Sequence, residues 1–264
     1  MLRGGGENTG KLLKTQGIVL HSLKYGEADV IITLFGRKTG KISAVVKGAR
    51  KPKSSMRGTV QLFNYGYYLL YKGKSLYTAV QCETVEPFVP LREQLLKLAY
   101  ASYISELLTH IMPHEEVNPA AFDLLLSSLK LISDENEVLG ARYFDINLMK
   151  ISGFFPRLLS CVVCAKNVLN DRGTIVFTAS KGGVLCSQCS QNEDEGIPVS
   201  RGTLVLTNRL SSMEPDFLKK LKIAPQFYEE MAEITKEFWK FILERELKTL
   251  NFINNVKDMN KKER

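Results

Sequence analysis

Val45–Gly58 reads VVKGARKPKSSMRG and lies between two groups of apolar, β-like segments. Its glycine, proline and serine residues predict a loop, which they share with five cations: Lys47, Arg50, Lys51, Lys53 and Arg57. The nearest acidic residues are Asp29 upstream and Glu83 downstream, so no carboxylate within the stretch neutralises it. A basic loop between strands can follow a phosphate backbone, and an ordinary solvated loop is the alternative interpretation.

Five β-like segments surround this loop without intervening helices. They cover residues 17–22, 30–35, 42–46, 60–71 and 76–85. Glycine-containing turns at 36–41 and 72–75 join neighbouring segments and indicate two hairpins. Five strands within about 75 residues predict a small closed barrel. An OB-fold over residues 11–86 matches this size, and the loops of that fold commonly hold single-stranded nucleic acid.

The excess positive charge is confined to the first third of the chain. The 264 residues include 36 Lys+Arg and 28 Asp+Glu, which gives a formal net charge of +8. Residues 1–80 contain 14 of the cations and 3 of the acids, a net of +11, and the remainder contains 22 and 25, a net of −3. A polyanion-binding module joined to a near-neutral body is the simplest explanation.

The composition is that of a globular chain long enough for two domains or more. No run approaches the roughly 20 apolar residues of a membrane span, and the N-terminus lacks the apolar core of a signal peptide. We therefore predict a cytoplasmic protein without a membrane partner. Residues 1–10 are predicted to be a disordered leader, either a vector remnant or an upstream start, and are excluded from the fold.

The apolar pattern becomes helical after two prolines at 87 and 90. Residues 87–155 are predicted to form a helical domain of three helices, from about 91 to Pro113, from Pro119 to about 132, and from about 138 to Ile151. Residues 196–264 are predicted to supply C-terminal helices that pack with this domain. The longest begins near Pro225, and residues 254–264 are predicted to be a frayed basic tail.

Four of the five cysteines form two pairs, Cys161-Val-Val-Cys164 and Cys186-Ser-Gln-Cys189, with 21 residues between them. Four thiolates around one site favour tetrahedral Zn²⁺. The intervening residues have the pattern of a β-hairpin, so residues 156–195 are predicted to be a zinc ribbon. Because all four ligands are thiolates, no coordination position stays open for water, which indicates one structural zinc ion. Loss of the metal, or two disulfides, is the alternative.

Four other features have ordinary structural interpretations. Residues 36–41 (GRKTGK) resemble a phosphate-binding loop, but the spacing is one residue short and a strand follows instead of a helix. His110 and His114 are four residues apart, but a proline between them argues against a shared helical metal site. His21 is predicted to be a half-buried structural residue, and Cys82 a small buried one.

Short motifs along the chain carry a resemblance to a known family. They are Tyr25-Gly-Glu-Ala-Asp29, Thr33-Leu-Phe35, Lys47-Gly-Ala-Arg-Lys-Pro-Lys-Ser54, Gly153-Phe-Phe-Pro156, the two cysteine pairs and Arg245-Glu-Leu-Lys248. In this order they resemble the RecO family of bacterial recombination mediators in the RecF pathway, over nearly everything from Lys11 to about Val256. Two departures are present: Thr249 stands where the family pattern has serine, and the first ten residues have no counterpart.

Resemblance to this family implies an OB-fold, a helical domain and a zinc ribbon, in agreement with the α+β multidomain fold predicted from the residues. It implies a non-enzymatic mediator of DNA break and gap repair, which binds single- and double-stranded DNA and anneals complementary strands. The implied partners are RecR and the C-terminal tail of single-strand-binding protein (SSB). RecA is an indirect partner, because the family helps to load this recombinase onto SSB-coated single strands. No catalytic residues are implied.

Phosphate contacts are predicted from the cations of the barrel and its loops. The predicted DNA-binding residues are Lys24, Tyr25, Arg37, Lys38, Lys41, Lys47, Arg50, Lys51, Lys53 and Arg57. Tyr25 is the candidate platform for base stacking because it is predicted to lie in a loop. Tyr65, Tyr67 and Tyr71 share one face of a strand, and that face is predicted to point into the core.

Two other classes of function stay open on the sequence. A zinc-containing enzyme that modifies nucleic acid would need an open metal site or a group of carboxylates, and Glu115 and Glu116 beside the histidines are the local candidates. A protein-interaction scaffold would use the basic barrel to bind an acidic protein tail, which is compatible with DNA binding.

Overall fold

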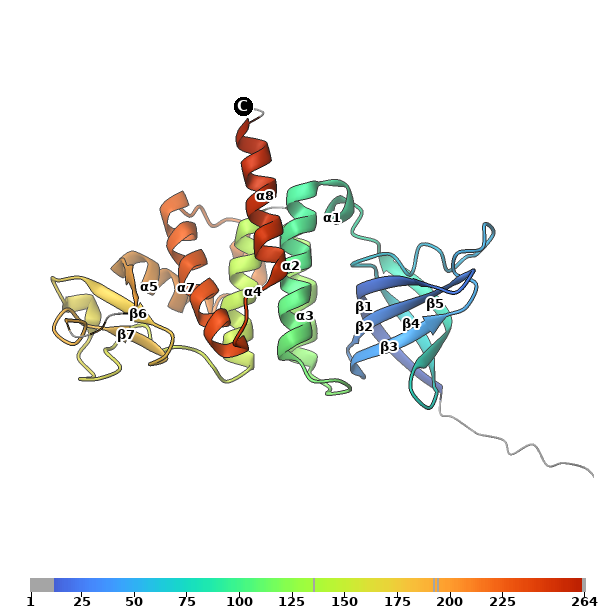
Figure 1. The fold of residues 1–264 in the computed structure, drawn as a ribbon, viewed down its shortest axis with the longest axis horizontal. Coiled ribbons are helices and arrows are strands. Elements are labelled where there is room, and N and C mark those ends of the chain that lie inside the picture. The colour runs from blue at the N-terminus through green and yellow to red at the C-terminus, as the bar shows by residue number, and fades with distance from the viewer. Residues whose placement is uncertain (1–11, 135, 192, 194, 263–264) are drawn as a thin grey trace, which may run out of the picture. The chain divides into compact units, whose positions relative to one another are not determined.

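The computed structural model describes residues 12–134, 136–191, 193 and 195–262 (Figure 1). The chain divides into two compact units. The barrel unit contains the residues up to Val89 together with Met112–Phe122, and the helical unit contains Pro90–Ile111 and the residues from Asp123 onward. The leader predicted for residues 1–10 lies outside the described residues.

Five strands close the predicted barrel. They are β1 (Leu12–Tyr25), β2 (Asp29–Gly36), β3 (Gly40–Val46), β4 (Tyr65–Lys72) and β5 (Tyr77–Glu86). Their order around the barrel is β1-β2-β3-β5-β4, in which only β3 and β5 run parallel (Figure 1). This connectivity is that of an OB-like Greek-key barrel, so the predicted fold class is confirmed.

Alternation along each strand fills the barrel core. Strand β2 buries Val30, Ile32 and Leu34, and β3 buries Ile42 and Ala44 in the same way. Because successive side chains of a strand point to opposite faces, the residues between them form the outer surface of the barrel. The apolar residues of each of these strands are therefore divided between a face in the core and a face on the surface of the barrel.

Three of the four tyrosines of β4 face outward, which corrects the prediction that these three form a core stripe. Tyr65, Tyr67 and Tyr71 are half-buried or exposed, whereas Tyr68 is fully buried. The hydroxyl of Tyr68 donates a hydrogen bond to the carbonyl oxygen of Thr59 (2.9 Å), which satisfies its polar atom inside the core. Both faces of β4 carry apolar or aromatic residues, so the alternation along the strand does not reveal which face points into the core. A shift of one residue exchanges the two faces.

Two further predictions for barrel residues differ from the structure. Strand β1 shifts its register between Val19 and His21, and His21 is exposed rather than half-buried. Cys82 packs against the core but is only partly buried. Burial nevertheless raises the pKa of the Cys82 thiol to about 11, so it is protonated at neutral pH.

The segment Met112–Phe122 completes the barrel unit. The backbone amide of Glu115 donates to the carbonyl oxygen of Lys41 (2.9 Å), and the carboxylate of Glu115 pairs with Lys72 (3.0 Å). The ring of Phe122 stacks on that of Phe35, with centroids 6.4 Å apart. These contacts cover the part of the barrel beside the β2–β3 turn.

Helices form most of the second unit. They are α1 (Pro90–Glu93), α2 (Leu95–Ile111), α3 (Pro119–Asp134), α4 (Glu137–Ile151), α5 (Arg201–Leu210), α6 (Pro215–Leu218), α7 (Pro225–Leu243) and α8 (Lys248–Lys262), and the residues of α3 up to Phe122 belong to the barrel unit. The first predicted helix is interrupted at Gln94, which separates α1 from α2. The predicted frayed tail is wrong for the described residues, because α8 continues through Lys262. No helix in the described part of the chain has both the length and the apolar character needed to cross a membrane.

A buried polar network joins α2, α4 and α7. Asp145 Oδ1 accepts hydrogen bonds from the Tyr103 hydroxyl (2.7 Å) and from the Trp239 indole nitrogen (3.2 Å). Its other oxygen lies 3.2 Å from the Arg142 guanidinium. Burial raises the pKa of Asp145, although the nearby Arg142 and the hydrogen bonds oppose this shift. Because Asp145 and Trp239 are buried from solvent, the network holds helices together in the interior of the helical unit.

Candidate metal centre and nucleic-acid interface

The predicted hairpin between the cysteine pairs is part of a three-stranded sheet in the helical unit. Strands β6 (Ile175–Thr178) and β7 (Gly183–Leu185) form the hairpin, and β8 (Ile197–Val199) pairs with the other edge of β6. The backbone amide of Val162 donates to the carbonyl oxygen of Val184 (2.9 Å), which fixes the first cysteine turn against β7. The second turn follows β7 directly.

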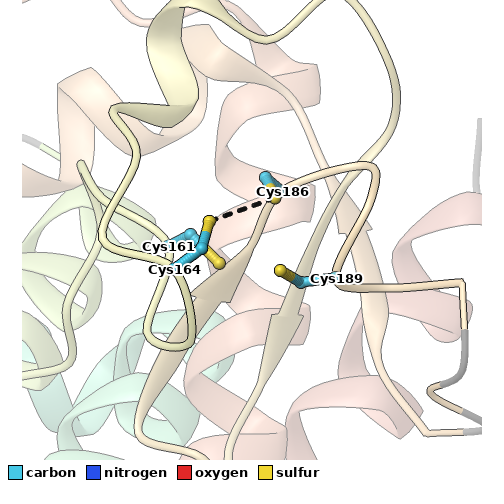
Figure 2. A group of neighbouring side chains, drawn as sticks. All are labelled: Cys161, Cys164, Cys186 and Cys189. Atoms are coloured by element: carbon cyan, nitrogen blue, oxygen red, sulfur yellow. Dashed lines mark hydrogen bonds between the residues drawn. The ribbon is translucent and has the colours of Figure 1, made fainter.

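The four cysteines of the two pairs come together at one point. Figure 2 shows their sulfurs facing a common centre. The four Sγ atoms lie within 4.8 Å of one another, and the Sγ atoms of Cys164 and Cys186 are 3.7 Å apart. Tetrahedral coordination with Zn–S bonds of about 2.3 Å requires sulfur separations of about 3.8 Å. A disulfide requires about 2.05 Å, so the geometry fits a metal site and not the predicted alternative of two disulfides.

Backbone amides stabilise the thiolate form of Cys161 in the first cysteine pair. Burial opposes ionisation of Cys161, but hydrogen bonds from the backbone N–H groups of Cys164, Cys186 and Val163 lower its pKa to about 6. The pKa of Cys189 is raised to about 12, first by its hydrogen bond with Cys186 and then by burial and the other thiols. One thiolate thus forms readily, and a bound cation would replace the protons that the remaining thiols share.

Asp171 supports the second cysteine turn, a role that none of the sequence motifs predicts. Its Oδ2 accepts from the Ser187 backbone amide (2.7 Å), and its Oδ1 accepts from the Ser187 hydroxyl (2.8 Å) and the Gly173 amide (3.0 Å). Those N–H bonds, led by that of Ser187, lower the pKa of Asp171. The available signal was an aspartate two residues before a glycine, which is typical of a turn that accepts backbone N–H groups.

The basic loop is anchored on the β1–β2 turn. The Arg50 amide donates to the carbonyl oxygen of Ala28 (2.8 Å), and the Gly48 amide donates to Asp29 Oδ1 (2.8 Å). Arg50 Nη1 reaches the carbonyl oxygen of Gly26 (3.3 Å). Ala49 of the loop is fully buried in the barrel core. Asp29, the nearest upstream acid in the sequence, therefore holds the loop backbone, and this anchoring presents the cations of the loop to solvent.

The structure divides the predicted DNA-binding residues between two places. One group lies on the basic loop and the adjacent end of β1, and all of its members are exposed: Lys24, Tyr25, Lys47, Arg50, Lys51, Lys53 and Arg57. The other group follows β2: Arg37, Lys38 and Lys41. Tyr25 is the last residue of β1 and pairs with Asp29, so its predicted place in a loop is wrong, although its ring is 53% exposed.

Arg37 and Lys41, in the group that follows β2, are more buried than the residues of the basic-loop group. The Arg37 amide donates to the carbonyl oxygen of Gln16 (2.9 Å), and the Arg37 guanidinium lies 5.8 Å from the centroid of the Phe122 ring. Lys41 is half-buried, and burial lowers its pKa. Lys38 is exposed, and its backbone amide donates to the Thr15 hydroxyl (3.1 Å). The two groups therefore differ in how freely their side chains can reach a ligand.

The residues considered for catalysis have structural partners. Glu115 pairs with Lys72, and this contact together with Tyr77 lowers the pKa of Glu115. His110 lies 3.9 Å from Glu106. Within the described ranges, the four cysteines are the group of His, Cys, Asp and Glu side chains close enough to share a metal ion. The carboxylates and histidines near residues 110–116 thus supply no second metal centre in the part of the chain that the structure describes.

A groove of about 1290 Å³ lies between the ribbon sheet and α7 in the helical unit. Phe177, Ile197 and Phe241 contribute its apolar surface. Cations and carboxylates also line it: Glu195, Glu233, Lys236, Glu237, Lys240, Glu244, Arg245 and Glu246. Because both signs of charge are interspersed, the electrostatics of the groove do not select an acidic or a basic occupant.

Comparisons with known proteins identify relatives of both parts of the chain. The family model described as Recombination protein O N terminal matches residues 11–88, and the one described as Recombination protein O C terminal matches residues 92–251. A DNA repair protein RecO from Moorella thermoacetica is 36% identical over 245 residues, which is 93% of this chain and 91% of the relative. Proteins of the same name from Alkaliphilus metalliredigens and Acetivibrio thermocellus are 37% and 32% identical, over 89% and 92% of this chain and 95% and 97% of theirs. The resemblance predicted from the motifs is confirmed, and the chain belongs to the RecO family of DNA repair proteins.

Proposed function

We propose that this protein is a non-enzymatic recombination mediator, which binds single- and double-stranded DNA and anneals complementary strands. The observation that carries the proposal is the anchored basic loop. Its backbone is bonded to Ala28 and Asp29, and its cations are exposed on the surface of an OB-like barrel. Such a surface neutralises phosphates without reading the bases, so binding is tolerant of sequence.

Annealing follows from the same electrostatics. Two nucleic-acid strands of like charge repel one another, and a basic surface that holds both raises their local concentration while it screens the repulsion. No covalent step is required, so no nucleophile or open metal position is needed. Loading of recombinase onto SSB-coated strands, with RecR and the SSB tail as partners and RecA as an indirect one, is the further activity that membership of the family supports.

The four-cysteine site is proposed to hold one structural Zn²⁺. The residues fit this ion because all four donors are sulfur and their separations match tetrahedral coordination. Cys161, Cys164, Cys186 and Cys189 would bind it, and the ion would supply cross-linking of the two cysteine turns. A segment of about forty residues cannot build a large apolar core, so this cross-link would contribute directly to its folding.

The decisive experiment measures binding of fluorescent oligo-dT to the full chain at several salt concentrations, with zinc determined on the same sample. If four to six phosphates are neutralised, log K should fall against log salt with a slope of roughly −3 to −4. Annealing of complementary oligonucleotides should be accelerated under the same conditions. Weak or salt-insensitive binding would reject the proposal and leave the protein-interaction scaffold as the better account.

A further inference from the structure

The barrel carries cations at two opposite ends. Strand direction places the β1–β2 turn and the basic loop at one end, and the β2–β3 and β4–β5 turns at the other. We call these the loop end and the turn end. The loop end contains Lys24, Lys47, Arg50, Lys51, Lys53 and Arg57. The turn end contains Lys14, Arg37, Lys38, Lys41, Lys72 and Lys74.

Contacts within the barrel unit connect several of the turn-end cations to one another. Lys72 pairs with Glu115, whose backbone amide bonds to the carbonyl oxygen of Lys41. The Lys38 amide bonds to the Thr15 hydroxyl, next to Lys14 in β1. The loop end also contains the carboxylates Glu27 and Asp29, and the turn end contains Glu115, Glu116 and the exposed Glu83, which pairs with Tyr67 across β4 and β5. The described cations outnumber the carboxylates at either end.

The two ends are electrostatically separate. Asp29 and Gly36 bound β2, and the seven residue steps between them span about 23 Å. This is more than twice the Debye length of about 8 Å at physiological ionic strength. The outward residues between the ends on β2 and β3 are Ile31, Thr33, Ser43 and Val45. None is charged or aromatic, so this surface offers a crossing strand neither a phosphate contact nor a stacking platform.

Each end has an accessible aromatic ring beside its cations. At the loop end, Tyr25 is 53% exposed and follows Lys24 directly. Toward the turn end, Tyr67 is 37% exposed, and the ammonium group of Lys14 lies 5.3 Å from the centroid of its ring. An aromatic ring beside cations is the combination that holds a base and its phosphate in single-strand binding.

We propose that the barrel holds two separate nucleic-acid sites, one at each end, and that each site takes one strand. The inference rests on the proposed DNA-binding function and specifies how two strands are accommodated. Each site neutralises its own strand, and the uncharged outward residues of β2 and β3 between the ends favour separate binding over one strand that occupies both sites. A single chain can then hold two strands at once, which is the arrangement that annealing requires.

The test counts oligonucleotides bound to the full chain. Native mass spectrometry and stoichiometric fluorescence titration at low salt would use an oligo-dT of about eight nucleotides, within the range that one OB-fold accommodates. The wild-type chain should bind two. The loop-end variant (Lys51→Ala, Lys53→Ala, Arg57→Ala) and the turn-end variant (Lys14→Ala, Lys38→Ala, Lys74→Ala) remove three charges each. Each variant should bind one oligonucleotide and lose most of its annealing activity.

Matched controls separate the possible failures. Lys219, Lys220 and Lys222 are exposed in the helical unit, and their triple alanine variant should keep both sites and full annealing. A wild-type chain that binds one oligonucleotide, with both end variants weakening that same site, would show a single strand crossing the barrel. Binding of one oligonucleotide that the turn-end variant leaves intact would equally overturn the two-site inference, while the proposed function would stand. Absence of any oligo-dT binding would reject both.

Discussion

The carboxylate of Glu106 on α2 holds Thr249 at the start of α8. Glu106 Oε2 accepts a hydrogen bond from the Thr249 backbone amide (2.9 Å) and another from its hydroxyl (2.6 Å). Glu106 Oε1 accepts from the backbone amide of Lys248 (3.1 Å). The first amides of a helix have no partner within it, and here an acidic side chain from another helix satisfies two of them. Thr249, which stands where the family pattern has serine, thus contributes a hydroxyl as well as a backbone amide to this contact.

Replacing Glu106 by alanine should loosen α8. The variant leaves helix amides without their charged acceptor, and we expect a loss of about 1 to 2 kcal/mol in the free energy of unfolding. Hydrogen exchange should increase first at the N-terminal turn of α8. Glu229, an exposed residue of α7, supplies the control, since Glu229→Ala should leave both measurements nearly unchanged. Equal effects of the two variants would contradict a specific tether.

The same contact predicts a pH dependence. Burial alone would raise the pKa of Glu106, but hydrogen bonds from Thr249 and Lys248 hold it below its usual range. A carboxylate with a lowered pKa in the folded state stabilises the protein above its unfolded-state value of about 4.3. This contribution is lost as the pH falls through the lowered folded-state value. Denaturant titrations of wild type and Glu106→Ala should therefore differ at pH 7 and converge in strong acid; a constant difference would argue against the ionic contact.

Neutralising two cations of the basic loop should weaken DNA binding for every sequence. Arg50→Ala combined with Lys51→Ala removes two phosphate contacts, so the slope of log K against log salt should become shallower by about 1.4 for single strands. The melting temperature should change little, because backbone atoms make most of the loop anchors. Lys219→Ala with Lys220→Ala is the charge-matched control. A large drop in melting temperature would mean that the loop is structural.

Removing one metal ligand should affect the ribbon and spare DNA affinity. Cys164→Ser deletes an exposed thiol of the cluster, so the zinc content of the purified chain should fall. Limited proteolysis should then cut within residues 156–199, and a chelator should reproduce this on the wild type. Oligo-dT affinity should be retained. Loss of that affinity in a variant with an intact ribbon would show that the ribbon itself contacts DNA.

Gly40 and Gly26 provide a matched pair for backbone strain and packing. Both have positive φ angles, +66° and +54°, at which an alanine costs roughly 1 to 2 kcal/mol. A Cβ on Gly40 would lie 2.0 Å from the carbonyl oxygen of Glu116, whereas one on Gly26 meets nothing within 4 Å. Gly40→Ala should therefore lower the unfolding free energy by clearly more than Gly26→Ala. Similar losses in chemical denaturation would mean that the segment around Glu116 moves away at little cost.

Local patterns made the metal centre predictable from the sequence. The two residues between Cys161 and Cys164 fix a short turn, so spacing alone brings both sulfurs to one point. The barrel was similarly predictable, because strand length, turn residues and the absence of helices are local signals. The inward face of β4 was not, since Tyr67 and Tyr68 are equally plausible core residues until the register is known.

Long-range relationships account for the other differences. The last residues resemble a tail because their own sequence is polar, and α8 is stabilised by Glu106, 143 residues before Thr249. The sequence predicts Arg37 and Lys41 as simple phosphate contacts, but Phe122 and Glu115, which follow β5 and α2 in the chain, lie beside them. No spacing rule connects such distant residues, because the fold and not the chain brings them together.

Because Met112–Phe122 belongs to the barrel unit, the barrel is completed only after this later segment has been synthesised. Strand β5 ends at Glu86, and the ring that stacks on Phe35 arrives 36 residues later. At ordinary rates of translation this interval lasts roughly 2 to 7 s. During that time the nascent barrel can form all of its strands and still expose the apolar side of Phe35. A gene fragment that stops at residue 89 would lack the Phe122 ring, so an isolated barrel that keeps this contact has to include the later segment.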